Sequence, residues 1–146
     1  MFEVIAATIA NLILSDELSS LFDSIKNKIK DKNDKRMFID QLSSYLSKEQ
    51  KYNGLDSLAN EYDFEGICKY LRNGAVDKIE IAISGTESER KAARNDLYNR
   101  AFYHAGANTK ESQEGVRKMV SNAIDMLRRI ARGKVTFEDK VLAAEI

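Results

Sequence analysis

The side chains best suited to chemistry in this chain are one histidine and one cysteine. His104 follows Arg100 by four positions, which on a helix puts the two side chains on neighbouring turns of one face. Imidazole titrates near neutral pH and can move a proton, so this pair is the candidate for acid–base catalysis. The alternative is that His104 is hydrogen-bonded at a seam between helices or is simply exposed.

Metal, cofactor and nucleotide sites are not expected. A metal site needs several converging ligands, and Cys68 and His104 are the only residues of their types. The acidic residues Glu61, Asp63 and Glu65 lack the spacing of a calcium loop and are typical of solvated helix starts. No glycine precedes a Lys-Ser or Lys-Thr pair, as a phosphate-binding loop requires. We therefore predict no cofactor and favour a protein that is not an enzyme.

Two clusters of basic residues are candidates for contact with nucleic-acid phosphates. The residues that we select as nucleic-acid contacts are Lys26, Lys28, Lys30, Arg128, Arg129 and Arg132. Both clusters also fall at the expected C-terminal ends of helices, where the helix dipole favours cations. A solvated helix end is therefore the alternative interpretation.

Charge and cysteine content narrow the class of protein. The 23 basic residues are balanced by 23 acidic ones, so the chain as a whole is not drawn to polyanions. A lone cysteine inside an apolar pattern favours a buried thiol in a reducing, cytoplasmic setting. The apolar stretch at residues 2–14 contains Glu3 and is shorter than the roughly 20 residues of a membrane span. We expect one domain over residues 1–146 and no membrane contact.

Helical periodicity recurs along the whole chain, and proline is absent. We therefore predict an all-α fold, a compact bundle of about eight to nine helices. The expected helices cover approximately residues 2–13, 16–29, 34–46, 55–62, 64–71, 76–84, 87–105, 109–132 and 136–146.

The clearest helix start is at Thr86, which forms a capping box with Glu89. That helix should stop at Gly106 in a left-handed turn, before Asn108 or Thr109 caps the next long helix. The two helices are predicted to form a long C-terminal antiparallel hairpin.

Residues 76–83 have the β-branched composition of a strand. Asp77, Lys78 and Glu80, however, lie where a helix would place its wet face. We interpret the segment as a helix that ends at Gly85 and follows a left-handed turn at Gly74.

Apolar residues near both ends of the chain are candidates for a partner surface. They are Ile5, Ile9, Leu12, Val141 and Leu142. Burial in the core is the alternative.

Three closely spaced aromatic residues, Tyr98, Phe102 and Tyr103, are a further set of which some can face a partner. Because the chain starts with apolar residues and ends inside an expected helix, we expect the N-terminal part of a longer protein, and a short complete protein is the alternative.

The small and apolar positions of the C-terminal hairpin form a pattern with a family resemblance. They are Leu97, Tyr98, Ala101, Phe102, Ala105, Ala107, Asn108, Thr109, Ala123 and Leu127. This pattern resembles the closing hairpin of N-terminal domains in bacterial antiphage proteins of the NACHT and wider STAND class. The resemblance implies an all-α domain that precedes a nucleotide-binding oligomerisation module and mediates assembly or signalling. It assigns no site residue.

Arg100 and His104 also resemble the Arg–His pair of HEPN ribonucleases, although they lie closer together and Ala101 replaces a polar residue of that motif. The function we expect is a non-catalytic module for protein–protein interaction or oligomerisation, in a bacterial antiphage protein if the first resemblance holds. The alternatives are nucleic-acid binding through the basic helix ends and, third, HEPN-like ribonuclease activity.

Overall fold

The computed structural model describes residues 2–49 and 63–133. These residues form seven helices and no strand: α1 (Phe2–Ile13), α2 (Ser19–Lys26), α3 (Lys32–Glu49), α4 (Phe64–Asn73), α5 (Val76–Ser84), α6 (Glu87–Ala105) and α7 (Lys110–Ala131). The all-α prediction is confirmed, but the count of eight to nine is not matched. Two of the expected helices, at 55–62 and 136–146, lie outside the described residues.

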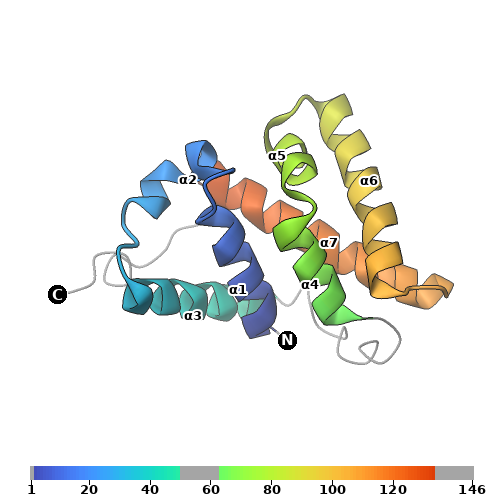
Figure 1. Cartoon of the computed structure of the whole chain (residues 1–146), viewed down its shortest axis with the longest axis horizontal. Coiled ribbons are helices and arrows are strands. Elements are labelled where there is room, and N and C mark those ends of the chain that lie inside the picture. Colours follow the sequence, from blue (N-terminus) through green and yellow to red (C-terminus); the bar gives the residue numbers. More distant parts are fainter. Residues whose placement is uncertain (1, 50–62, 134–146) are drawn as a thin grey trace.

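Helix α1 lies at the centre of the bundle (Figure 1). It contacts α3 on one side and α4 and α7 on the other. Helices α5 and α6 pack together, and α7 runs behind α4 and α5 to join the two halves. Because α7 contacts α1, α2, α5 and α6, it is the helix that ties the bundle together.

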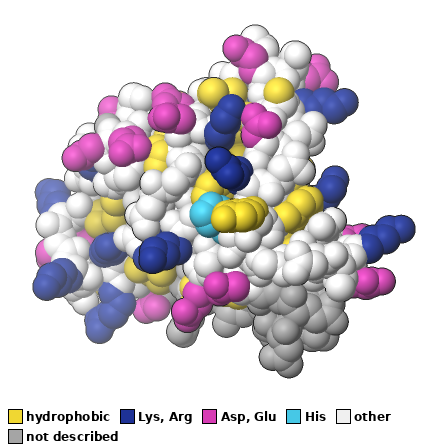
Figure 2. Space-filling view, turned by 45° about the vertical axis from the view of Figure 1, so that its right-hand side comes forward, with side chains coloured by type: hydrophobic (Ala, Val, Ile, Leu, Met, Phe, Trp, Pro, Cys, Tyr) yellow, Lys and Arg dark blue, Asp and Glu magenta, His cyan; other side chains and the backbone are white. Residues whose placement is uncertain are grey.

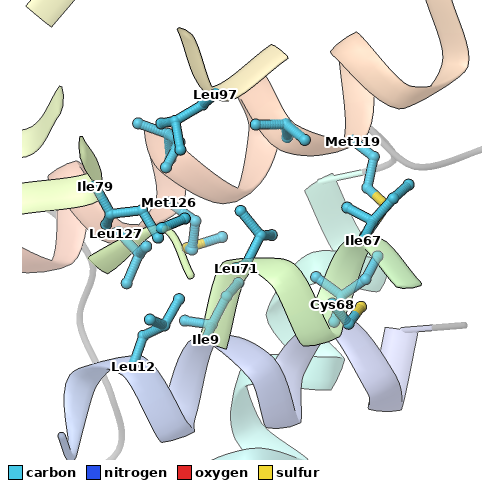
Figure 3. Close-up of a cluster of buried hydrophobic side chains, with 14 of the residues drawn as sticks. Ile9, Leu12, Ile67, Cys68, Leu71, Ile79, Leu97, Met119, Met126 and Leu127 are labelled. Carbon is cyan, nitrogen blue, oxygen red and sulfur yellow. The ribbon is translucent and has the colours of Figure 1, made fainter. Parts of the chain in front are cut away.

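The core forms where α1, α4, α5 and α7 meet (Figure 3). Ile9 of α1, Leu71 of α4, Ile79 of α5 and Leu127 of α7 are all buried and point toward one another. A void that these side chains border has a volume of about 10 Å³, which is at the lower limit of the space that one water molecule needs. The core is therefore closely packed.

The apolar stripe of α1 belongs to this core and not to the surface. Ile5, Ile9 and Leu12 expose 1%, 1% and 2% of their surface, because α3, α4 and α7 cover them. This corrects the expectation that the stripe is open to a partner. Val141 and Leu142, the other part of that expected surface, lie outside the described residues.

The long helices begin and end at the predicted signals. The Thr86 hydroxyl accepts a hydrogen bond from the Glu89 amide (3.2 Å), and the Glu89 carboxylate accepts one from the Thr86 amide (2.9 Å). Gly106 ends α6 with a φ of 62°. Thr109, not the preceding asparagine, caps α7 and pairs with Ser112. The capping box and the left-handed glycine are thus confirmed.

The segment of strand-like composition is helix α5, as predicted, and Gly85 follows its last residue. The left-handed turn predicted at Gly74 is wrong, since its φ is −123°. Only Gly74 and Ala75 separate α4 from α5, and Ala75 is already the N-cap of α5. The connection from α4 to α5 therefore contains no residue with a left-handed backbone conformation.

Helices α6 and α7 lie side by side and run in opposite directions. Arg94, in the middle of α6, donates to the Ser121 hydroxyl (3.3 Å) and the Asp125 carboxylate (2.5 Å) of α7. Nearer the turn between the helices, the Arg117 guanidinium lies 5.4 Å from the Tyr98 ring centroid. These contacts link the pair along its length.

Candidate functional site

A surface cleft with a volume of about 610 Å³ lies between α4 and α6. Its principal side chains are Lys69, Tyr70 and Asn73 from α4 and Arg100, Tyr103 and His104 from α6. We call it the α4–α6 cleft. Figure 2 shows this face, with the single histidine in cyan beside yellow side chains and dark-blue Lys and Arg side chains around them.

Helical spacing aligns the cleft residues on each wall. Positions 66, 69–70 and 73 recur every three to four residues along α4, as do 100 and 103–104 along α6. Residues with this spacing share one face of a helix. Each wall of the cleft is therefore one face of one helix.

Gly66 allows the two walls to approach closely. A Cβ atom at this position would lie 2.7 Å from the backbone oxygen of His104. The Asp63 amide donates to the Ala105 oxygen (2.8 Å), and the Asp63 carboxylate caps α4 by accepting from the Gly66 amide (2.9 Å). The start of α4 is thus fixed against the end of α6, which sets the width of the cleft.

Three aromatic side chains form the floor and rim of the α4–α6 cleft. The His104 ring stacks on the Tyr70 ring, with centroids 4.6 Å apart and planes 14° apart. The Tyr103 ring meets His104 at 85°, with centroids 5.4 Å apart. Tyr70 is buried, whereas Tyr103 is 75% exposed. His104 is exposed and held against aromatic neighbours, so the predicted alternative of an exposed histidine describes it best.

The two charged side chains that line the cleft are positive. They are Lys69 and Arg100, and none of the described residues that line the cleft is a carboxylate. The nearby Asp96 pairs with Lys78 at 3.0 Å. Burial raises the pKa of the Tyr70 hydroxyl, and the positive charge of Arg100 opposes that rise only in part. Tyr70 is therefore neutral at physiological pH.

The structure brings Arg100 and His104 into the same cleft, as the candidate catalytic pair requires. Sequence reasoning had also named Tyr103 among the aromatic residues that can face a partner, and its exposure agrees with that. It missed Lys69 and Tyr70, because a lysine and a tyrosine inside a short amphipathic helix carry no signal of a site.

The first basic cluster lies at and after the end of α2. Lys26 pairs with Asp16 at 2.7 Å, and this ion pair lowers the pKa of Asp16. Lys28 and Lys30 are exposed. One of the three predicted nucleic-acid contacts is thus partly neutralised by an intramolecular partner.

The second basic cluster is divided between two faces of α7. The Arg129 guanidinium donates to the Tyr45 hydroxyl of α3 and lies 5.5 Å from the Tyr45 ring centroid. Arg128 is half-buried and lies near Arg90 and Arg94 of α6, while Arg132 is exposed. Arg129 therefore packs between α7 and α3. Arg128 and Arg132 lie on the side of α7 that faces α6.

Comparisons of the chain with protein-family models, with curated proteins and with solved structures found no match. The resemblance to NACHT and STAND proteins thus stays a prediction. Within residues 2–49 and 63–133, no group of three or more His, Cys, Asp and Glu side chains can hold a metal ion. The same residues include no helix that is long and apolar enough to cross a bilayer.

Proposed function

We propose that this chain is a protein-interaction module that binds its partner in the α4–α6 cleft. The occupant is an acidic segment of another protein that carries an aromatic or large aliphatic side chain. One observation carries the proposal: Tyr103, 75% exposed, lies at a cleft whose described lining residues include two cations and no carboxylate.

Tyr103 is far more exposed than the other large hydrophobic side chains of the described residues. Among the described residues the exposed large hydrophobic side chains are Val4, Ile81 and Tyr103, and the first two expose only 41% and 39%. Tyrosine is enriched where binding energy concentrates in interfaces, because its rigid ring buries a large area at a low entropy cost. Tyr103 is therefore the expected anchor for an apolar side chain of the partner.

The electrostatic side rests on Lys69 and Arg100, one on each wall of the cleft. An Arg guanidinium binds a carboxylate through two parallel hydrogen bonds, and a Lys ammonium adds a point charge. Complementary charges favour an acidic partner over a basic one and speed their association. A carboxylate that follows an aromatic residue in the partner would reach both walls.

A displayed library of random peptides tests this proposal directly. We expect selection on the folded chain to enrich peptides in which Asp or Glu lies next to Trp, Tyr, Phe or Leu. In ¹H–¹⁵N spectra a selected peptide should shift the amide signals of Gly66 and Gly74, which line the cleft. Enrichment of basic peptides, or shifts confined to other faces, would overturn the proposal.

Matched variants separate the cleft from the rest of the surface. Tyr103→Ala and Arg100→Glu should each weaken binding of a selected peptide at least about tenfold, which corresponds to about 1.4 kcal/mol. Lys91→Glu changes an exposed residue of the same helix outside the cleft and should leave the affinity nearly unchanged. Equal effects of the three substitutions would contradict binding in the cleft.

A second candidate, ribonuclease activity, is supported by the placement of Arg100 and His104 in one cleft. The stacked Tyr70 ring restrains the imidazole, as a proton-transfer group requires. Purified chain should then cleave single-stranded RNA, and His104→Ala should abolish cleavage while thermal unfolding is unchanged. RNA that stays intact during long incubation with the wild-type chain would remove this candidate.

The setting that we propose is an assembly protein of bacteria, cytoplasmic and of the NACHT or STAND type, as the pattern in residues 97–127 suggests. Self-association of the chain itself can be measured as absolute mass by light scattering over a wide concentration range. A dimer or larger assembly would support a role in oligomerisation. A monomer at every concentration would exclude self-association of this chain, and binding of another protein would remain to be tested.

A further inference from the structure

Four arginines gather on the seam between α6 and α7, away from the cleft. Arg90 and Arg94 lie one turn apart on α6, Arg128 lies in the last turn of α7, and Arg132 is the C-cap residue of α7. The ion pair of Arg94 with Asp125, at 2.5 Å, joins the two helices at this point. We call these four arginines the arginine cluster.

Intramolecular bonds hold two members of the cluster in place. An Arg90 guanidinium nitrogen donates to the Gly85 oxygen at 2.8 Å, and Arg94 is held by Asp125. The Nε atom of Arg128, by contrast, is buried and has no hydrogen-bond acceptor among residues 2–49 and 63–133. Buried donors in proteins nearly always have a partner. Two of the four arginines are therefore fixed in position, and Arg128 Nε–H is a donor that no described protein group satisfies.

Electrostatics agree with this geometry. Burial lowers the pKa of Arg128, and the positive charges of Arg132, Arg90 and Arg94 lower it further. Asp125 opposes the effect but is already paired with Arg94. Arg128 thus lies near three other guanidinium groups, and an anion bound among them would relieve their mutual repulsion.

We propose that the arginine cluster binds a phosphate or polyphosphate group. Guanidinium groups present paired donors that match phosphate oxygens, and a phosphate offers more oxygens and more charge than a carboxylate. The source of the group is a free polyphosphate or the backbone of a nucleic acid. None of these arginines lines the α4–α6 cleft, so this site and the proposed protein-binding site stand or fall separately.

Titration with inorganic pyrophosphate tests the site. In ¹H–¹⁵N spectra of arginine side chains, the Arg128 Nε–H signal should shift with pyrophosphate and saturate. Arg128→Gln and Arg132→Gln should each weaken binding at least about tenfold. Arg132 is exposed, so its variant is expected to fold even if the Arg128 variant is unstable. Arg72→Gln, an exposed change on α4, is the matched control and should bind as wild type does.

Asp125→Asn gives a test of opposite sign. Removal of the carboxylate that pairs with Arg94 should tighten pyrophosphate binding several-fold, whereas a purely structural role of the cluster predicts no gain. A pyrophosphate titration without a saturable shift at Arg128 would overturn the proposal. Equal losses in Arg132→Gln and Arg72→Gln, or weaker binding in Asp125→Asn, would also overturn it.

A single-stranded oligouridine distinguishes the two sources of phosphate. If the ligand is a nucleic-acid backbone, the oligonucleotide should bind more tightly than pyrophosphate, be displaced by it and weaken steeply with added salt. If the ligand is a free polyphosphate, pyrophosphate should bind more tightly and oligouridine should not displace it. Either result supports the site. Oligouridine binding that persists in both Arg128→Gln and Arg132→Gln would place nucleic-acid binding elsewhere.

Discussion

Two isoleucines of α5 show how strongly position decides the role of a single residue. Ile79 is completely buried, whereas Ile81, two positions later, is 39% exposed. We expect Ile79→Ala to lower the free energy of unfolding by about 2–5 kcal/mol, because it leaves a cavity in the core.

The matched substitution Ile81→Ala should change the free energy of unfolding by about 1 kcal/mol or less. Urea denaturation of both variants measures the difference. Similar losses at the two positions would contradict the packing of α5 against α6 and α7.

Cys68 illustrates a residue whose structural role was predicted from the pattern around it. It is 3% exposed and unpaired, and burial raises the pKa of its thiol although a hydrogen bond with Thr8 opposes the rise. A protonated, buried thiol is a poor nucleophile. The prediction of a buried thiol is therefore confirmed, and the structure assigns Cys68 to the core.

At the scale of elements, Gly106 determines how α6 ends. Its φ of 62° lies in the left-handed region, and a Cβ atom there would meet no other atom within 4 Å. Gly106→Ala should therefore lower the free energy of unfolding by about 1–2 kcal/mol through backbone strain alone.

Gly106→Asn should lose less stability than Gly106→Ala, because asparagine adopts this conformation more readily. Thermal unfolding compares the two variants. Equal melting temperatures for alanine and asparagine would contradict backbone strain as the cause of the loss.

The start of α6 should make the stability of the fold depend on pH. The hydrogen bonds from Thr86 hold the pKa of the Glu89 carboxyl below its ordinary value of 4.5. A carboxyl whose pKa is lowered by folding stabilises the fold above its unfolded pKa, and this contribution is lost as the pH falls through the folded pKa. The contribution of Glu89 should therefore disappear in acid.

Glu89→Gln provides the comparison, since glutamine can accept the same hydrogen bond without titrating. As the pH is lowered from about 6 to about 3, the melting temperature of the wild type should fall relative to that of the variant. Parallel curves for the two proteins would argue against a titrating cap.

For the whole molecule, the decisive feature is the central place of α1. Ile9 of α1 is buried where α1, α4 and α7 meet (Figure 3). We expect Ile9→Ala to lower the free energy of unfolding by about 2–5 kcal/mol, in one cooperative transition, and to leave the mass in solution unchanged.

Val4, on the same helix, is 41% exposed and supplies the control. Val4→Ala should have a much smaller effect on stability. Light scattering and urea denaturation of both variants distinguish a core residue from an interface residue. A lower oligomeric mass with unchanged stability in Ile9→Ala would restore α1 as a partner surface.

The sequence by itself determined the class of fold and the ends of its clearest helices. The capping box of Thr86 and Glu89, the left-handed turn at Gly106 and the helical interpretation of α5 all depend on residues within one or two turns of each other. Interactions of such short range are visible in the order of the amino acids. The sequence left two candidates for the next cap, Asn108 and Thr109, because both offer a suitable side chain.

Only the tertiary structure decided which faces are covered and which side chains meet. Periodicity shows that α1 has an apolar face, but the helices that bury it come from residues 32–49, 64–73 and 110–131. The cleft joins Tyr70 to His104, and the arginine cluster joins Arg90 to Arg128, across long stretches of chain. Such contacts depend on how the helices pack against one another, and no local pattern of residues encodes that packing by itself.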